Sequence, residues 1–545
     1  MENVGKQRAT KFTIYAIILV SFVLRLLLLR VDRIVRWDEP DYLLMGINLF
    51  SGRGLTVGQV PELHYAPLFP IVTGTLGLVL GDAKRASDLC YLIFGTLLPL
   101  CTYLVARRTS GTTAALITAA LVGVFPPLSA GVLFWGTMIE PMYVVLLLTA
   151  LYAWFRALDT NLARWHLGAG VLLGLAYLTK PEALLHMAFL WAIVTLYRLA
   201  TRTMRDRRTI TNLALAALAF IMVISPYIAY LYRYTGRVLL SGKLGVTYAA
   251  GLGVVIGDPV LYDRELARLD EAGEHIIWFS PDRFKYSLLD YIRQDPRLFL
   301  YRTWHNFNAL EQSLFSHQAF PFYLLGLVAL AWFARKWDQR RVWSMAMLLA
   351  FCLPLASFLP FHIELRYFAP LFPVLLLWVA EGITELGHWW RETVSNLMGH
   401  EPHPAWLALG TRLPAFALCA LFLALQPFVV ANGLADMNPA PREAGLWLKA
   451  NTPPETLLMT RDTQVPFYAE RPWIPSANEP YERLIHYARK NRVQYWVVDE
   501  REVTVIRPQL SFLADTTNPP PELEFVRKFS GGKWAVIVYR LVAAP

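Results

Sequence analysis

Residues 12–42 read FTIYAIILVSFVLRLLLLRVDRIVRWDEPDY, a long apolar run followed at once by a charged loop. A helix needs about 20 consecutive apolar residues to cross the core of a bilayer, and the run 12–31 has that length. The run lacks a small-residue cleavage site and leads into charged sequence, so we expect an anchor rather than a removed signal peptide. Arg25, inside the run, is expected to snorkel towards the interface.

The rest of the chain repeats this pattern. Of 545 residues, 55% are hydrophobic and only 17% are charged, with a mean hydropathy of +0.38. A soluble chain of this length carries more charge. Further apolar segments lie at 87–106, 113–134, 141–155, 167–179, 184–197, 213–232, 319–334, 342–361, 367–384 and 413–430. Backbone groups must be paired inside lipid, so these roughly eleven spans predict an all-α polytopic membrane domain.

Lys and Arg gather on one side of these spans. If the spans alternate, one side receives Lys6, Arg8 and Lys11, then the clusters 107–108, 156–164, 198–208 and 335–341. The other side receives Asp38, Glu39, Asp41, Glu62, Asp82, Glu140 and Glu182. Basic loops favour the cytoplasm, so we read the acidic side as the exterior of an inner (plasma) membrane. The net charge of +10 then reflects topology rather than nucleic-acid binding.

The chain divides unevenly. Residues 1–430 hold the spans, with long exterior loops at 32–86 and 233–318. Beyond them, hydropathy drops, and short strand and helix patterns alternate over 431–545, which predicts a small extracytoplasmic α/β domain. The four cysteines lie within apolar spans and are expected to be buried small hydrophobes, without a disulfide framework.

Several familiar signals are missing from the sequence. The glycines near residue 251 lack the dinucleotide-binding spacing, and no Gly-Lys-Ser/Thr loop exists to hold a nucleotide phosphate. No Cys pairs or His-Glu-x-x-His helix suggest zinc. Energy for chemistry outside the cell must therefore arrive on the substrate itself.

Polar motifs recur at the predicted outer ends of the spans. They are Trp37-Asp38-Glu39-Pro40-Asp41-Tyr42, His64-Tyr65-Ala66-Pro67, Lys84-Arg85, Glu140-Pro141, Lys180-Pro181-Glu182 and Glu364-Leu365-Arg366-Tyr367. Taken singly, each acidic loop reads most simply as a helix cap, and each cation as a snorkelling side chain. Ionisable groups from several spans that face a shared cavity instead favour a functional site.

In their order, these motifs resemble the GT-C superfamily of polyprenyl-phosphate-sugar-dependent glycosyltransferases. The likeness is to the branch with the protein O-mannosyltransferases and the lipid A aminoarabinose transferase. It is carried by Ser51-Gly52-Arg53-Gly54, Leu178-Thr179-Lys180-Pro181-Glu182 and Arg366-Tyr367-Phe368-Ala369-Pro370, and covers most of residues 10–385. One departure is Ala66-Pro67, where that family has two prolines.

The resemblance implies a lipid-phosphate sugar donor and an acceptor that is a membrane lipid, glycan or protein. Such a reaction needs a carboxylate to deprotonate the acceptor and cations to hold the phosphate. Asp38 is the candidate base, Glu39 a group that orients the acceptor or raises the pKa of its neighbour, and Glu140 a second acid. The phosphate candidates are Arg85, Lys180 and Arg366, with Lys84 behind them. The candidate substrate loop comprises Tyr42, His64, Pro67, Glu182 and Tyr367.

No cofactor is required by this scheme, although Glu62 and His64 could supply half of a divalent metal site. Three alternatives stay open. A transporter or flippase of lipid-linked glycans would carry charges near the midplane and show paired halves. A ligase or polymerase would place its key Arg and His residues in one late loop. In a third alternative, the C-terminal domain carries the function and the spans only anchor it. Eleven spans are excessive for an anchor.

Overall fold

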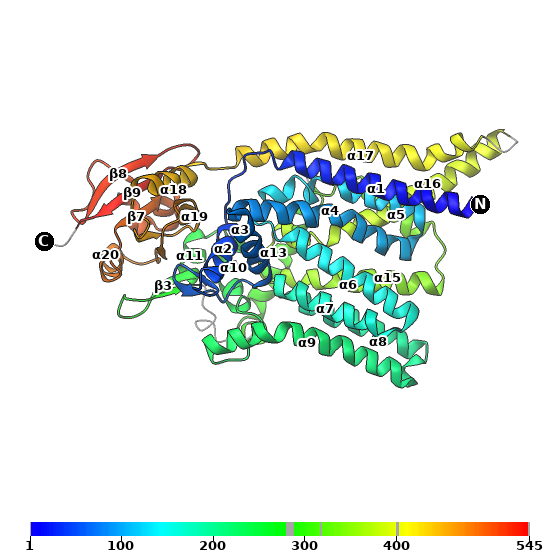
Figure 1. The fold of residues 1–545 in the computed structure, drawn as a ribbon, viewed down its shortest axis with the longest axis horizontal. Coiled ribbons are helices and arrows are strands. Elements are labelled where there is room, and N and C mark those ends of the chain that lie inside the picture. Colours follow the sequence, from blue (N-terminus) through cyan, green and yellow to red (C-terminus); the bar gives the residue numbers. More distant parts are fainter. Residues whose placement is uncertain (1, 279–287, 317–318, 399–402, 543–545) are drawn as a thin grey trace.

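The structure is a computed structural model that describes residues 2–278, 288–316, 319–398 and 403–542. A bundle of long helices fills one part of the molecule, and a small sheet domain caps one end of it (Figure 1). The bundle helices are α1 (Glu2–Leu28), α4 (Ala83–Ser110), α5 (Thr112–Val124), α6 (Glu140–Thr160), α7 (Ala163–Thr179), α8 (Ala183–Ala200), α9 (Arg207–Thr235), α14 (Leu324–Phe333), α15 (Gln339–Cys352), α16 (Leu371–Met398) and α17 (Pro404–Ala435).

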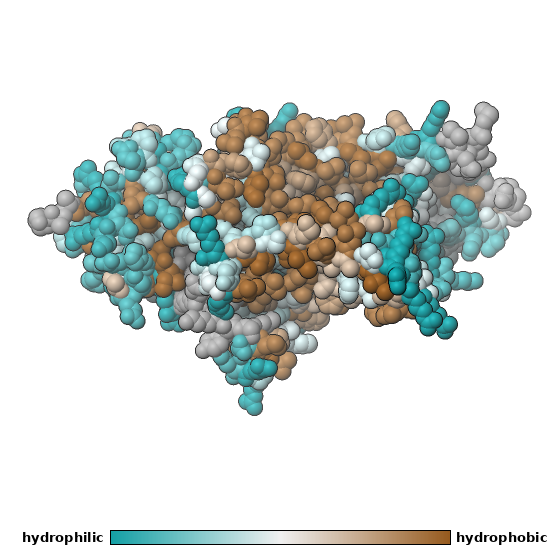
Figure 2. Space-filling view, turned by 60° about the horizontal axis from the view of Figure 1, so that its bottom comes forward, coloured by the Kyte–Doolittle hydropathy of each residue, from teal (hydrophilic) through white to brown (hydrophobic). Residues whose placement is uncertain are grey.

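Each of the eleven apolar segments overlaps one of these helices, so the predicted helical membrane domain is confirmed. Among the described residues, eight helices are long and apolar enough to cross a membrane, while α5 and α14 are shorter apolar helices. The count of eleven is therefore not confirmed. On the face drawn in Figure 2, a broad apolar band lies between two hydrophilic ends. This is the surface of a multi-pass membrane protein.

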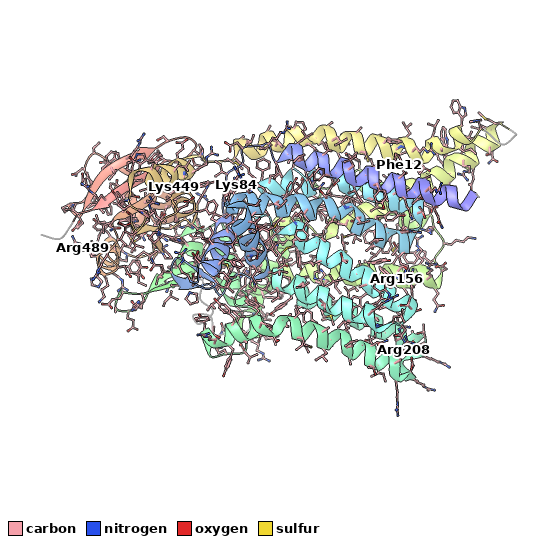
Figure 3. The ribbon with its side chains drawn as sticks, in the orientation of Figure 1. Phe12, Lys84, Arg156, Arg208, Lys449 and Arg489 are labelled. Atoms are coloured by element: carbon pink, nitrogen blue, oxygen red, sulfur yellow. The ribbon has the colours of Figure 1, made fainter. Side chains whose placement is uncertain are left out.

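The two ends of the bundle differ in charge. Arg156 and Arg208 lie at the end far from the sheet domain, whereas Lys84 lies beside that domain (Figure 3). Arg108, Thr201 and Arg340, from three of the basic clusters, line one cavity at the far end. We call this end the basic end and the opposite one the domain end. Alternation of the helices thus collects the basic clusters on one side, as the sequence predicted.

Arg25 corrects the expectation of a snorkelling side chain. It is fully buried, and its guanidinium donates to the carbonyls of Gly123 (2.9 Å) and Leu128 (3.0 Å). Helix α5 ends at Val124, and the last carbonyls of a helix have no partner within it. Arg25 satisfies such groups inside the bundle. The physical reason is local: a nearby set of acceptors replaces the lipid headgroups that a snorkelling cation would seek.

Short elements connect the bundle to the sheet domain at the domain end (Figure 1). The first loop forms α2 (Glu39–Phe50), β1 (Thr56–Val57), β2 (Val60–Pro61) and α3 (Leu68–Leu80). The second forms α10 (Leu244–Ile256), α11 (Pro259–Leu266), β3 (Ala267–Leu269), β4 (Ile276–Trp278), α12 (Leu288–Gln294) and α13 (Pro296–Leu314). Helix α11 is capped by Asp258, whose carboxylate accepts from the backbone N–H of Leu261 (3.0 Å).

The C-terminal part is a five-stranded sheet with helices packed against it, which confirms the small α/β domain. Its elements are α18 (Ala440–Asn451), β5 (Leu458–Thr460), α19 (Gln464–Ala469), β6 (Trp473–Pro475), α20 (Tyr481–Lys490), β7 (Tyr495–Asp499), β8 (Leu523–Phe529) and β9 (Val536–Leu541). The strand order is β6-β5-β7-β9-β8, parallel on the β6-β5-β7 side and antiparallel on the other. Helix α20 buries an apolar stripe against this sheet, as its helical periodicity requires.

Candidate active site

Four chain segments bring charged residues together at the domain end. Asp38 is the residue before α2, and Glu140 is the first residue of α6. Lys180 directly follows the last residue of α7, and Arg366 lies on the short 3₁₀ helix Leu365–Phe368 that precedes α16. All four positions are helix boundaries, where side chains can reach past the bundle. Segments far apart in sequence therefore contribute to one charged cluster.

Arg366 is the centre of this cluster. It is 7% exposed, and its guanidinium contacts Asp38 at 2.9 Å and Glu364 at 2.5 Å. Burial alone would lower the pKa of Arg366, but Asp38 and Glu364 raise it well above its usual value. Burial likewise works to raise the pKa of Glu364, and Arg366 overrides it and holds that pKa well below its usual range. A cation held permanently charged at this point can bind a phosphate bidentately.

Lys180 forms a second ion pair beside the first. Its ammonium lies 3.0 Å from Glu140, which is almost fully buried. The same ammonium lies 5.7 Å from the centre of the Tyr143 ring and 5.6 Å from that of Tyr367. The other oxygen of Glu140 has no hydrogen-bond partner among the described residues. Lys180 is thus anchored by one carboxylate and two aromatic faces, with donor capacity to spare.

Tyrosines surround these pairs. The Tyr42 ring packs against Tyr65 at 4.7 Å and against Phe69 at 5.7 Å. Burial, and then the nearby carboxylates Asp38 and Glu140, raise the pKa of Tyr42 well above its usual value, so its hydroxyl keeps its proton. The hydroxyl of Tyr367 lies 2.8 Å from Nε2 of His362. The cluster is therefore bounded by neutral hydroxyl groups as well as by charges.

A cavity of about 780 Å³ opens on one side of Arg366. Trp37, Asp38, Asp41 and Arg366 line it from the membrane domain. The turn Arg461-Asp462-Thr463 lines it from the C-terminal domain, so the cavity lies between the two parts of the chain. We call it the charged cavity, because carboxylates and guanidinium groups alternate along its wall.

A groove of about 530 Å³ opens on the other side, where Tyr367 lines it. Its wall is mostly apolar and includes Leu184, Leu244 and Phe358, with Glu182 among its few charged members. We call it the apolar groove. Arg366 lines the charged cavity and the next residue, Tyr367, lines the apolar groove, so both spaces open near the charged cluster. This arrangement can hold a molecule with a long apolar part, and a polar head near Arg366.

Helix α11 fixes the C-terminal domain over the charged cavity. Its buried Asp263 contacts Arg461 at 2.6 Å and Arg507 at 2.7 Å. Burial alone would raise the pKa of Asp263, but the guanidinium groups of Arg507 and Arg461 lower it to about 2. The pair Arg507–Glu502 (2.7 Å) extends this network into the domain. Removing one partner of such a buried network is strongly destabilising, so the turn 461–463 is held firmly.

Three predicted site residues lie elsewhere. Glu39 is 1% exposed and accepts two hydrogen bonds from Arg33, at 2.6 and 2.9 Å. Arg33 also contacts Asp88 at 2.6 Å, and Lys84 reaches the same carboxylate at 2.9 Å. Arg85 is exposed, 3.7 Å from Asp82. The structure brings Glu39, Lys84 and Arg85 to neither the charged cavity nor the apolar groove. Glu140 and Lys180 line neither space either, and belong to the site through their ion pair next to Tyr367.

The His64 loop is buried against the site, and Glu62, His64 and Pro67 line neither space. Glu62 accepts from the backbone N–H groups of His64 (2.5 Å) and Tyr65 (3.1 Å), and burial raises the pKa of Glu62 to about 7. Burial lowers the pKa of His64 well below its usual value. Pro67 is buried at the start of α3. Of this predicted loop, only Tyr65, which had no assigned role, reaches the charged cavity.

The structure adds no third ligand, among the described residues, to the candidate metal site of Glu62 and His64. Over the residues that the structure describes, no group of three or more His, Cys, Asp or Glu side chains could hold an ion. One carboxylate oxygen of Glu62 already accepts from the backbone N–H groups of His64 and Tyr65. A divalent metal at Glu62 and His64 therefore stays an untested hypothesis, and no step proposed below passes through it.

The cavity wall also contains residues that sequence reasoning missed. Tyr262 comes from α11, and Arg461, Asp462 and Thr463 come from the turn between β5 and α19. No motif marks these positions, and they lie more than 200 residues from Asp38 along the chain. Only packing of the C-terminal domain against the bundle brings them to the site.

Solved structures share this fold. The apo structure of ArnT from Cupriavidus metallidurans is 15% identical, with a TM-score of 0.61 over 99% of this chain and 100% of that chain. The same protein bound to undecaprenyl phosphate gives a TM-score of 0.57 at 15% identity, over 98% of each chain. The apo Archaeoglobus fulgidus oligosaccharyltransferase gives 0.51 at 16% identity, over 90% of this chain and 70% of that chain. The fold is that of a GT-C membrane protein.

One family model matches part of the chain. Residues 64–230 match the model described as dolichyl-phosphate-mannose-protein mannosyltransferase. No relative is found among the curated proteins. The resemblance to GT-C glycosyltransferases expected from the order of the motifs is thereby confirmed, through the family match over 64–230 and through the fold of nearly the whole chain.

Proposed function

We propose that this protein is a glycosyltransferase that moves a sugar from a polyprenyl-phosphate carrier to an acceptor on the extracytoplasmic face of the plasma membrane. The observation that carries the proposal is the cluster of Asp38, Glu140, Lys180 and Arg366, with an apolar groove on one side and a charged cavity on the other. The match of residues 64–230 to a mannosyltransferase family and the similarity to ArnT, whose structure holds undecaprenyl phosphate, support it.

In the proposed reaction, the carrier's apolar chain lies in the apolar groove and its phosphate lies beside Arg366 and Lys180. An acceptor hydroxyl in the charged cavity attacks the anomeric carbon of the sugar. The new bond from acceptor oxygen to carbon forms while the bond from carbon to phosphate oxygen breaks. Asp38 takes the hydroxyl proton, and the leaving phosphate keeps the electron pair, next to the two cations.

The charges of the resting site fit this scheme. Arg366 is paired with Asp38 and Glu364, and Lys180 with Glu140, so both cations are already held by carboxylates. An incoming phosphate competes with Asp38 for Arg366 and would leave that carboxylate free to accept a proton. Donor binding would thereby prepare the base.

The rival functions fit less well. A transporter would place its ionisable residues near the midplane on broken helices. Here the cluster sits where α2, α6 and α7 begin or end, next to the C-terminal domain. A glycan ligase or polymerase that relies on one late loop would not need Asp38 and Glu140, which precede the second long loop.

The experiment compares envelope lipids and glycoproteins, by mass spectrometry, in cells with and without the gene. A glycan mass that disappears on deletion should return with the wild-type gene and not with an Asp38→Asn variant. Sidedness is tested on the same cells by asking whether the modified molecule is accessible to an external glycosidase. Identical glycan profiles with and without the gene would count against the proposal.

A further inference from the structure

Trp37 stands out in the wall of the charged cavity. It directly precedes Asp38, lines the cavity, and is 53% exposed. Its φ is +58°, in the left-handed region that a bulky residue rarely adopts. Strained backbone at a bulky residue persists only where the surroundings hold it, and such positions cluster at functional sites. A glycine would fit this backbone without strain. The presence of a tryptophan at this position therefore indicates a role for its indole.

The neighbours of Trp37 hold the side chain in place. The guanidinium of Arg36 lies over the indole, 4.5 Å from the ring centroid. Arg36 is itself fixed, because it donates to the carbonyl of Phe134 (2.9 Å) and contacts Asp436 at 3.2 Å. On another side, a Cβ added to Gly136 would lie only 2.5 Å from the Trp37 ring. The backbone at Gly136 thus packs close to the base of the indole and leaves the rest of it exposed.

Two residues in the wall of the same cavity have buried polar atoms without a hydrogen-bond partner among the described residues. Arg36 is 9% exposed, and its Nε has no hydrogen-bond partner among the described residues; the same holds for Oδ1 of Asp41, which is 7% exposed. Both residues line the charged cavity. Buried donors and acceptors are normally satisfied, so a ligand with hydroxyl groups would complete them. Asp462 and Asn432 add further polar side chains to the wall.

The charged cavity thus combines an exposed aromatic ring with carboxylates, guanidinium groups and an amide. Such a combination of side chains suits the binding of a pyranose ring. The C–H face of the sugar ring packs on the indole, while its hydroxyls donate to carboxylates and accept from Arg and Asn. The carrier's chain has its own place in the apolar groove, on the far side of Arg366. Trp37 directly precedes Asp38, the proposed base for the acceptor hydroxyl, and both line the charged cavity, so we assign the group that packs on Trp37 to the acceptor side.

We propose that Trp37 is an acceptor-positioning residue, and that the acceptor is a glycan or glycolipid whose pyranose ring stacks on its indole next to Asp38. This inference rests on the proposed function and adds the class of acceptor. A peptide acceptor is the rival. An extended peptide offers no flat C–H face of this kind, and it does not call for carboxylates and guanidinium groups on both sides of an aromatic ring.

The test uses the full chain in lipid nanodiscs with two soluble probes, methyl β-D-glucopyranoside and a blocked Ala-Ser-Ala tripeptide. Saturation-transfer difference NMR reports which protons of each probe contact the protein. Wild type should transfer saturation to the ring C–H protons of the pyranoside. Trp37→Ala should weaken pyranoside binding about tenfold, and Trp37→Phe should recover part of it. The matched control is Trp389→Ala on α16, since Trp389 is 60% exposed and lies outside both spaces.

Two further measurements keep the outcome decisive. Undecaprenyl phosphate binding, measured on the same samples, should be unchanged in Trp37→Ala, because the phosphate cations are on other segments. A thermal melt shows that each variant is folded, and Trp37→Gly, which suits the positive φ, replaces Trp37→Ala if the latter fails to fold. Equal pyranoside binding by wild type and Trp37→Ala, or a tripeptide that binds through Trp37 instead, would overturn the inference while leaving the proposed function intact. If the wild-type protein does not bind undecaprenyl phosphate, the proposed function itself is wrong.

Discussion

Replacing Asp38 by Asn keeps the shape of the side chain but removes the proton acceptor. A general base typically contributes about 10²–10⁴-fold to a rate, so the rate of sugar transfer should fall by about that factor. This corresponds to about 3–5 kcal/mol of activation free energy. The fall should appear in kcat, because the acceptor can still bind in the charged cavity.

The structure adds a second expectation for the same variant. Asp38 contacts Arg366 at 2.9 Å and is one-third exposed, so it competes with a phosphate for that guanidinium. A partly exposed ion pair is worth about 0.2–1 kcal/mol. Its removal should therefore leave undecaprenyl phosphate binding unchanged, or up to about fivefold tighter. Glu364 remains on the other edge of the guanidinium and keeps Arg366 in place.

The assay measures undecaprenyl phosphate binding and sugar transfer in parallel on reconstituted protein. Glu39→Gln is the matched control, because Glu39 is the adjacent carboxylate but is tied to Arg33 away from both spaces. Breaking a buried pair costs about 3–5 kcal/mol, so Glu39→Gln should lower the melting temperature, with turnover per folded molecule largely kept. Near-normal transfer by Asp38→Asn would refute its role as base and make Glu140 the next candidate. Weaker lipid binding by Asp38→Asn would refute the competition argument.

Three further predictions follow from the same geometry. Arg366→Ala and Lys180→Ala should each weaken undecaprenyl phosphate binding about tenfold to a hundredfold, with partial recovery in Arg366→Lys; unchanged affinity would remove the residue from the phosphate site. A Cys at exposed Arg489 should react with an impermeant thiol reagent in intact cells, and a Cys at Arg208 only after permeabilisation; the reverse pattern would invert the topology (Figure 3). Because burial raises the pKa of Glu62 to about 7 from 4.5, the folded chain retains a proton that the unfolded chain releases, and stability should fall as pH rises from about 4.5 to 7. Glu62→Gln should abolish that dependence and stabilise the protein at pH 8 by up to about 3 kcal/mol, with no gain at pH 4; equal melting curves of both proteins at pH 8 would contradict it.

The membrane fold could be predicted from the sequence because its cause is local. A bilayer demands about 20 apolar residues in a row and internal pairing of every backbone group, and both demands can be read from one segment at a time. The side on which basic residues gather is also a property of short loops. The span count stayed uncertain because short helices such as α5 and α14 fall near the length limit.

Part of the candidate site was visible for a similar reason. Asp38, Glu140, Lys180 and Arg366 each sit at the end of a predicted span, so alternation of the spans already placed them at one end of the bundle. Alternation of the spans could not decide which of the residues at these span ends face the charged cavity. Glu39 follows Asp38 directly, yet its side chain points to Arg33 inside the protein. Successive residues at a helix start point in different directions, and only packing decides which direction is the cavity.

The C-terminal contribution came from the tertiary structure alone. The turn Arg461-Asp462-Thr463 has no motif, and its place in the cavity depends on the ion pairs that join Asp263 of α11 to Arg461 and Arg507. Likewise, Arg25 looked like a snorkelling residue until the carbonyls at the end of α5 were found within its reach. Sequence alone determined the elements and the end of the bundle where charges collect, since those follow from contacts between near neighbours in the chain. Which charges meet was decided only by folding, because partners such as Asp38 and Arg366 lie more than 300 residues apart in the sequence.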